Sequence, residues 1–247
     1  MKTNFRTLFF SLLLLCSTAV SAHDFEVDGV YYNITDELMK TVEVTFSGSS
    51  YNSVSNEYSG AVDIPATVTH SGVTYSVTNV ANSAFYACTG LTSVVIPEGV
   101  TNIGWDAFYA CGNLASISIP NSVKYIDDAA FYGTAWYDDQ PDGVVYAGKV
   151  LYAYKGTMSS STSITVATGT VAITANAFFG KTNLRSITIP TSITYIPSYC
   201  FEHCISLEDI TIPTSISYGM KCFHCCSSLS NESKQYIPND LITFEEE

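Results

Sequence analysis

The sequence predicts a mainly β protein in which an N-terminal β cap precedes a right-handed parallel β-solenoid of about six coils. Residues 91–113 (LTSVVIPEGVTNIGWDAFYACGN) and 114–136 (LASISIPNSVKYIDDAAFYGTAW) align without a gap at a period of 23 residues. The apolar residues, the Pro and the Ala-Phe pair keep their places while most residues between them change. A packing pattern is therefore repeated, and a period of this length is typical of solenoids, whose units bury their apolar faces against neighbours.

Four further copies of the pattern extend the predicted solenoid over residues 59–228. Residues 184–206 and 207–228 are clear copies, the last one residue short; residues 161–183 lack the Pro, and residues 59–90 carry nine extra residues. In each copy, L-x-x-I-x-I-P predicts a short strand that Pro ends, because Pro cannot donate to a β ladder. A second short extended piece follows. The Ala-Phe pair then combines a small residue, which lets coils approach, with a large residue that fills the core.

The first 22 residues predict a cleaved secretory signal. Lys2 and Arg6 precede an apolar run at 8–15, and small residues at 20–22 resemble a cleavage site. The apolar run is shorter than the roughly 20 residues that a membrane-spanning helix needs. A lipid anchor at Cys16 would be the one route to a membrane, and Leu15 disfavours it because lipoprotein signals usually place a small residue there. We therefore expect a secreted or cell-surface protein.

Residues 23–58 predict the N-terminal β cap, and residues 229–247 a C-terminal cap without repeat spacing. Asp28-Gly29 lies between two alternating segments and indicates a hairpin, while residues 41–46 alternate again.

The pattern L-x-x-I-x-I-P-x-x-V-x-x-I-x-x-x-A-F-x-x-C over residues 59–228 resembles the BspA-like subfamily of leucine-rich-repeat surface proteins. Residues 23–46 resemble the short β cap of secreted bacterial members. The resemblance implies a solenoid of the leucine-rich-repeat type and a role in adhesion to host matrix proteins or other cells. It implies no particular partner.

Residues 137–160 interrupt the repeats, and two segments flanking Ala147-Gly148 predict a hairpin that either stands out from the rod or replaces one coil. Loops on a rigid scaffold often carry function. The insertion is rich in rings, of which we expect about half to be exposed, and we predict partner binding at Trp136, Tyr137, Tyr146, Tyr152 and Tyr154.

A second predicted partner-binding surface is a column of rings one residue after the repeat Phe. It comprises Tyr86, Tyr109 and Tyr132 and continues with Phe179. Tyr offers rigid amphipathic area. Cross-coil stacking that stiffens the rod is the alternative interpretation of the same residues.

Charge limits the classes of partner. Residues 1–22 contain 2 of the 10 Lys and Arg residues and no acid, so the rest of the chain has 8 basic and 23 acidic residues. Its formal net charge is 8 − 23 = −15. Such a surface repels phosphate backbones, so we expect no nucleic acid partner. It also lacks the basic clusters that anionic bilayers attract. The expected partners are proteins or glycans on host or bacterial surfaces.

The cysteines and histidines have no arrangement that specifies catalysis. Six cysteines fall in two repeat positions that favour small buried side chains, and only Cys225 of the mature chain falls outside them. We expect mostly free thiols, with a disulfide between neighbouring coils or a zinc site as alternatives. His70, His203 and His224 lie in no nucleophile elbow or HExxH motif. Acid pairs such as Asp127-Asp128 and Asp138-Asp139 are interpreted as solvated charge.

The sequence therefore predicts a non-catalytic recognition and adhesion protein without a metal or cofactor. A glycan-binding accessory protein of a carbohydrate-utilising system is one alternative. A structural surface spacer is the other.

Overall fold

The computed structural model describes residues 23–48, 50 and 57–242. The predicted signal with Cys16, part of the predicted N-terminal cap and residues 243–247 lie outside this range. In the described part of the chain, no helix is long and apolar enough to cross a membrane. The structure is mainly β, with open sheets and three short helical segments, α1 (Ala135–Asp138), α2 (Asn231–Lys234) and η1 (Asn239–Leu241).

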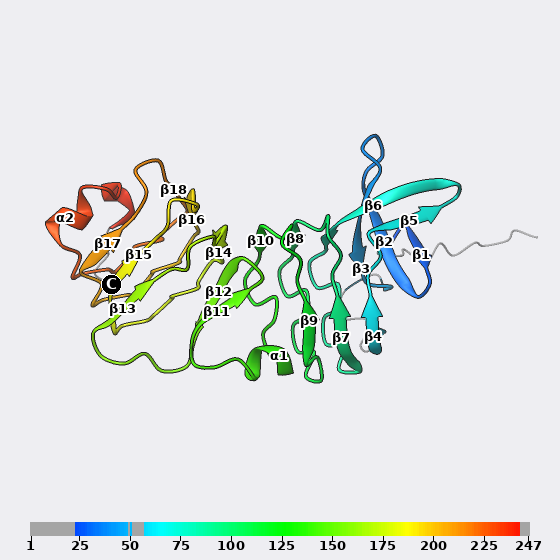
Figure 1. The fold of residues 1–247 in the computed structure, drawn as a ribbon, viewed down its shortest axis with the longest axis horizontal. Coiled ribbons are helices and arrows are strands. Elements are labelled where there is room, and N and C mark those ends of the chain that lie inside the picture. The colour runs from blue at the N-terminus through cyan, green and yellow to red at the C-terminus, as the bar shows by residue number, and fades with distance from the viewer. Residues whose placement is uncertain (1–22, 49, 51–56, 243–247) are drawn as a thin grey trace, which may run out of the picture.

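The N-terminal region forms an antiparallel β unit that continues into the repeats (Figure 1). Strands β1 (Phe25–Val27) and β2 (Val30–Asp36) pair around Asp28 and Gly29, whose φ values of 52° and 79° suit a two-residue turn. This confirms the predicted hairpin. Strand β3 (Thr41–Thr45) pairs with β2 and, in parallel, with β6 (Val73–Val80). Strand β5 (Thr67–His70) forms a hairpin with β6, which accounts for the nine extra residues of the first repeat.

Each repeat contributes two short strands, and the strands form two columns. The first-strand column contains two parallel sheets. One sheet consists of β4 (Gly60–Asp63), β7 (Leu91–Val95) and β9 (Ser116–Ser118). The other consists of β13 (Thr162–Thr165), β15 (Leu184–Thr188) and β17 (Asp209–Thr211). Val94 pairs with Ile117 and Ile187 with Ile210, one period apart. The second-strand column contains β6, β8 (Asn102–Ile103), β10 (Tyr125–Ile126), β14 (Ala172–Ile173), β16 (Tyr195–Ile196) and β18 (Ser217–Tyr218).

The core contains a ladder of parallel phenylalanine rings. Phe85 and Phe108 have ring centroids 4.8 Å apart, Phe108 and Phe131 5.6 Å, and all three are fully buried. In the second half of the chain, Phe201 lies 5.3 Å from both neighbours in the ladder. The repeat pattern thus encodes a stack of rings, with the small residue before each Phe buried beside it, as the sequence predicts.

The insertion between the two halves takes the place of a repeat. Strands β11 (Gly143–Ala147) and β12 (Val150–Lys155) form the predicted hairpin, and β12 pairs in parallel with β14. Successive side chains of a strand point to opposite faces, and in β12 they serve two cores. Tyr152 packs with the first half and Leu151 with the second. Of the two alternatives left open by the sequence, replacement of a coil is the correct one.

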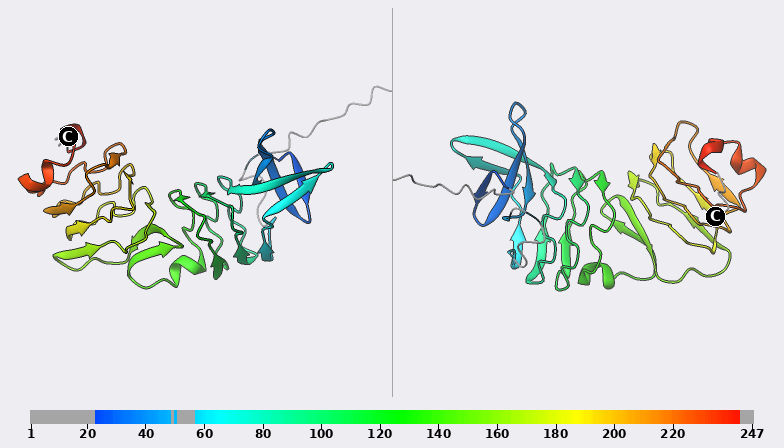
Figure 2. Two further views of the ribbon diagram at one scale, coloured as in Figure 1. Left: turned by 45° about the horizontal axis from the view of Figure 1, so that its top comes forward. Right: turned by 180° about the vertical axis from the view of Figure 1, so that it is seen from behind.

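The stack is bent, as the two views of Figure 2 show, and in Figure 1 the second-strand column follows the upper, inner edge of the bend. At the C-terminal end, α2 packs on β17, where Ser233 Oγ accepts the Ile210 N–H at 3.1 Å. Leu229 and Ile237 are buried there. An otherwise open strand edge is thereby covered.

Candidate functional site

The tyrosine column is defined here as Tyr86, Tyr109 and Tyr132, which the structure brings together as predicted. Their ring centroids are 5.2 and 5.3 Å apart and their planes nearly parallel, at 5° and 19°. Backbone bonds fix this register, since the residue after each of the first two tyrosines donates to the carbonyl of the tyrosine on the next repeat. Tyr86 and Tyr109 are half-buried, and Tyr132 is 58% exposed. Stacking covers ring faces, so the column offers its edges and Tyr132, at its end, is the most accessible ring.

Tyr132 borders a recess where the regular stack meets the insertion, which we call the junction recess. Its volume is about 130 Å³. It is lined by Tyr132, Tyr137, Tyr152, Asp128, Asn176, Ala129, Ala153, Ala175 and Ala177. Three of the predicted site residues therefore meet here. Tyr137 and Tyr152 contact edge to face, with centroids 5.7 Å apart at 87°. Lys155 Nζ lies 5.8 Å from the Tyr137 ring centroid.

The polar groups of the junction recess, whose volume is about 130 Å³, also join the two halves of the chain. Asn176 Nδ2 donates to Asp128 Oδ2 at 2.8 Å. Outside the recess lining, Thr174 Oγ1 donates to the Ile126 carbonyl at 3.0 Å and joins the same two halves. The Phe131 N–H donates to the Tyr152 hydroxyl at 3.0 Å. Burial is the main cause that raises the pKa of Tyr152, and it also raises the pKa of Tyr137. Both phenols therefore stay neutral hydrogen-bonding groups at physiological pH.

The remaining rings of the insertion have packing roles. Trp136 contacts Phe131 edge to face at 4.9 Å, the Tyr146 hydroxyl accepts the Ala167 N–H at 2.9 Å, and Tyr154 lies 6.4 Å from Phe178. All three side chains are half-buried. The expectation that about half of the five rings would be exposed is wrong, because Tyr152 is buried and the other four are half-buried. The physical reason is that the hairpin takes the place of a repeat. Its rings therefore pack against Phe131 and Phe178, where the phenylalanine of a regular repeat would lie.

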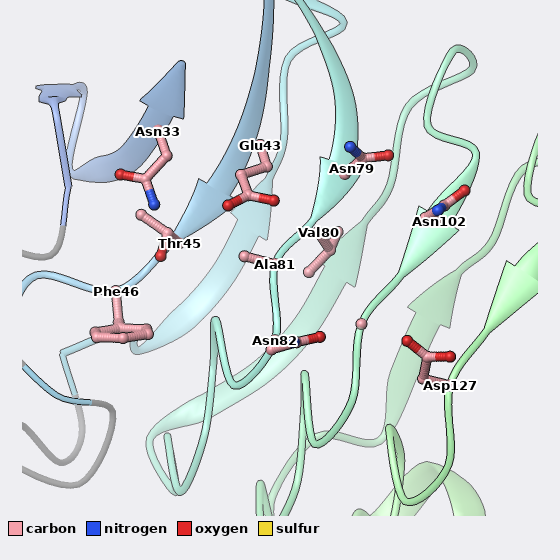
Figure 3. Close-up of a pocket in the computed structure, with 11 residues that line it drawn as sticks. Asn33, Glu43, Thr45, Phe46, Asn79, Val80, Ala81, Asn82, Asn102 and Asp127 are labelled. Atoms are coloured by element: carbon pink, nitrogen blue, oxygen red, sulfur yellow. The ribbon is translucent and has the colours of Figure 1, made fainter. Parts of the chain in front are cut away.

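A second recess, which sequence reasoning missed, lies on the inner face between β3, β6 and β8 (Figure 3). We call it the inner-face recess. It has a volume of about 320 Å³ and is rich in amides and carboxylates, with one aromatic ring; its side chains include Asn33, Glu43, Phe46, Asn79, Asn82, Asn102 and Asp127. Partial burial raises the pKa of Glu43, and a hydrogen bond from Asn33 opposes that rise.

The inner-face recess depends on a close approach of two repeats. Asn82 Oδ1 accepts the Trp105 N–H at 2.9 Å. A Cβ at Gly104 would lie 2.4 Å from that same oxygen, so only glycine fits at this position. The sequence did carry a signal for this site, since Asn79 and Asn102 follow a Thr at equal positions of successive repeats. Repeats of a polar residue at one position line up across a parallel sheet.

The cysteines in the repeat positions are buried, as the sequence predicts, and among the described residues they form no disulfide. In three repeats the thiol donates to the Phe carbonyl of the preceding repeat: Cys111 to Phe85, Cys204 to Phe178 and Cys226 to Phe201, at 2.9 to 3.1 Å. Burial raises the pKa of Cys111 and of Cys204 to about 12. These thiols are therefore structural and unreactive at neutral pH.

Of the candidate histidines, His203 and His224 lie side by side, with ring centroids 6.1 Å apart, whereas His70 lies apart from them. His70 stacks on Phe25 in the N-terminal region, with centroids 4.3 Å apart, far along the chain from His203 and His224. Asp138 and Asp139 are exposed, as expected of solvated charge.

Comparison with known proteins accounts for the repeat. The model of the BspA type leucine rich repeat region matches residues 65–137 and 151–247, with six copies. The chain belongs to the BspA-type leucine-rich repeat family. The match resumes at residue 151, within the predicted insertion, in agreement with the position of β12 in the stack.

Solved structures of other bacterial leucine-rich repeat proteins are similar to this BspA-type chain. A T. pallidum leucine-rich repeat protein is 24% identical, with 85% of this chain and 92% of that chain covered and a TM-score of 0.46. A Bacteroides ovatus leucine-rich repeat protein is 28% identical, covering 82% and 57%, with a TM-score of 0.45. A Faecalibacterium prausnitzii leucine-rich cell surface protein is 17% identical, covering 83% and 74%, with a TM-score of 0.26. Comparison with curated proteins finds no match.

Proposed function

We propose that this protein is a non-catalytic recognition and adhesion protein, secreted or held at the cell surface, that binds a protein partner. The observation that carries the proposal is the position of Tyr132. Its ring ends the tyrosine column, is 58% exposed and borders the junction recess beside Asp128. An accessible aromatic ring next to a small pocket with a polar rim is the usual composition of a binding hot spot.

Three further features support a surface protein of this kind. The family repeat provides an extended scaffold without a nucleophile motif, and the predicted signal at 1–22 would direct export. The similar F. prausnitzii protein is described as a cell surface protein. We also infer a right-handed winding of about six coils beneath an N-terminal cap. The parallel pairing of equivalent strands one repeat apart supports this inference.

Binding of the mature protein to an array of purified matrix proteins and to whole cells tests the proposal. We expect Tyr132→Ala to weaken binding to the captured partner by about 30-fold, since loss of a hot-spot ring costs about 2 kcal/mol or more. Phe179→Ala is the matched control, because Phe179 holds the equivalent repeat position in the second half and is 48% exposed. Equal affinities of the parent and Tyr132→Ala would exclude the tyrosine column as the binding surface.

The inner-face recess favours a second candidate function, glycan capture. Amide and carboxylate groups can hold sugar hydroxyls, and Phe46 can contact a sugar ring. Farther along the same face, Tyr125 and Tyr195 are exposed by 59% and 44% and border a recess of about 120 Å³. Amphipathic rings with few fixed polar groups are typical of small-ligand sites.

A glycan array separates the two functions. Under glycan capture, Asn102→Ala reduces retention of the bound glycan by about 10-fold or more, whereas Tyr132→Ala does not. Asn121→Ala is the control, because Asn121 is exposed and outside this recess. An array on which the parent retains no glycan excludes this second function.

A further inference from the structure

Two outer positions of the repeat change their chemistry together in the last two repeats. The first position after the core Phe holds an aromatic residue in four repeats, and Glu202 and His224 in the last two. The second position holds Ala or Gly in the same four repeats, and His203 and Cys225 in the last two. The change therefore gives four adjacent residues, Glu202, His203, His224 and Cys225, whose side chains are all metal-ligand types.

His203 and Cys225 are larger than the Ala and Gly residues that hold the same left-handed position in the earlier repeats. Every residue at the second position has a left-handed φ, between 54° and 70°, and His203 and Cys225 have 61° and 60°. Gly adopts this conformation freely, and a larger side chain costs energy there. His203 is exposed, so burial in the core does not offset that cost. The His203 ring contacts Phe179 and His224 edge to face, with centroids 5.8 and 6.1 Å apart, so this costly position holds His203 against the other histidine.

Backbone pairing between the turns of the last two repeats brings the four residues together. The His203 N–H donates to the His224 carbonyl at 2.9 Å. The two imidazole centroids are 6.1 Å apart. One ligand atom from each of His203, His224 and Cys225 lies within 4.8 Å of the other two.

These separations are close to those of a metal site. A tetrahedral zinc ion, with bonds of about 2.0 Å to nitrogen and about 2.3 Å to sulfur, requires ligand atoms roughly 3.3 to 3.8 Å apart. Cys225 Sγ already lies 3.4 Å from His224 Nδ1. The exposed His203 side chain supplies the third ligand once its ring nitrogen moves roughly 1 Å closer to the other two ligand atoms.

The surroundings favour a cation. Glu202 Oε1 lies 3.1 Å from His224 Nδ1, and both side chains are nearly buried, with exposures of 11% and 13%. The Glu202 carboxylate and the Cys225 thiol both face Nδ1 of His224, so the carboxylate places a negative charge beside the bound cation. Cys225 is also the one described cysteine that is not buried, so its thiol is accessible.

We propose that His203, His224 and Cys225 bind a divalent transition metal ion of the zinc class, with Glu202 as the supporting carboxylate. Nitrogen and sulfur ligands select such ions over calcium or magnesium. Binding breaks the S–H bond of Cys225, forms a sulfur–metal bond and releases one proton to solvent, with no change of oxidation state. Three protein ligands leave one coordination position for water. The sequence alone favoured free thiols here because it did not show that Cys225 and His203 meet.

Calorimetric titration of chelator-treated mature protein with Zn²⁺ alone tests the proposal. We expect one Zn²⁺ per chain, with an affinity that rises with pH because the thiol must lose its proton. His203→Ala and Cys225→Ser should each weaken binding by about 10-fold or more. His70→Ala is the matched control and should bind as the parent does, because His70 lies in the N-terminal β5–β6 hairpin.

Substitution with Co²⁺ gives a readout that is specific for the ligands. The parent should show a thiolate-to-cobalt charge-transfer band, and Cys225→Ser should lose it while its far-ultraviolet circular dichroism stays unchanged. Absence of stoichiometric binding by the parent overturns the proposal. So does binding by His203→Ala and Cys225→Ser with the affinity of the parent, or a cobalt complex without the thiolate band.

Discussion

The repeats before the insertion, residues 59–136, and those after it, residues 161–228, share a core but differ outside it. In both halves the phenylalanine rings stack at separations of 4.8 to 5.6 Å. One residue after the Phe, the first half has three tyrosines and the second has Phe179, Glu202 and His224. This position can change its chemistry because its side chain lies beside the core and not in it.

The insertion is the element on which both halves depend. The two hydrophobic clusters meet at β12, where Val150 and Tyr152 belong to the first and Leu151 to the second. In a repeat protein, stability is approximately the sum of the units and of the interfaces between neighbours. Damage at the junction should therefore separate the halves, whereas damage within one half should weaken that half.

Replacing residues 138–159 by a short Gly/Ser linker should have the largest effect. It removes the buried side chains of Val150, Leu151, Tyr152 and Met158. At about 1.5 to 3 kcal/mol for each apolar side chain, the loss is comparable with the whole stability of a typical domain. We expect urea unfolding, followed by circular dichroism, to lose its single cooperative transition.

The control for the linker variant is Asp138→Asn with Asp139→Asn, which alters two exposed charges of the same segment and leaves β11 and β12 intact. It should unfold as the parent does. A linker variant with the midpoint and cooperativity of the parent would show that β12 is no part of the stack.

Phe108→Ala and Phe201→Ala compare the two cores at equivalent positions. Both rings are fully buried between two other rings. Each substitution should lower the free energy of unfolding by about 3 to 5 kcal/mol, because it opens a cavity. Urea denaturation measures the change. An unchanged stability of either variant would show that the proposed register is wrong in that half.

Alkaline pH should destabilise the cysteine-rich second half more than the first. Burial raises the pKa of Cys204 and Cys222 to about 12 from an ordinary value of 9.0, and it raises the pKa of Cys200 and Cys226 as well. In the first half it raises the pKa of Cys111 to about 12. A raised thiol pKa stabilises the fold fully below pH 9, and this contribution is lost as the pH rises from 9 towards 12.

The variant Cys204→Ala measures this linkage. Between pH 9 and 12 each such thiol lowers stability by up to about 1.4 kcal/mol per pH unit, so the variant should lose less stability than the parent over that range. Val123→Ala is the control, because it removes buried apolar atoms without an ionising group. Parallel pH profiles for the parent and Cys204→Ala would contradict the assignment of a buried thiol.

Tyr109→Ala should have the smallest effect on stability. Its ring stacks on Tyr86 and Tyr132 outside the core. Each such cross-strand aromatic pair contributes about 0.2 to 1 kcal/mol, so urea denaturation should show a loss of no more than about 2 kcal/mol. A loss as large as that of Phe108→Ala would show that the tyrosine column belongs to the core and is unavailable to a partner.

The repeat made much of the fold predictable. The spacing of Leu, Ile, Pro and Phe predicts strand positions, the end of each first strand and the buried ladder, because these depend on contacts between equivalent residues of neighbouring repeats. The Asp28-Gly29 turn was predictable for a local reason, since its two positive φ values suit those residues. The stacking of Tyr86 on Tyr109 follows from the same register.

Sequence by itself determined what recurs in this protein: the period, the strand ends at Pro, the buried Phe and Cys positions and the hairpin of the insertion. Tertiary structure alone decided how non-equivalent parts meet. It placed β12 within the stack, gathered Tyr132, Tyr137 and Tyr152 around the junction recess and set Asn33 and Glu43 beside the asparagines of the repeats. It also placed a ligand atom of His203 within 4.8 Å of Cys225. The physical reason is that a period specifies contacts one repeat apart, whereas contacts made by insertions, caps and a shortened repeat depend on the packed geometry of the whole stack.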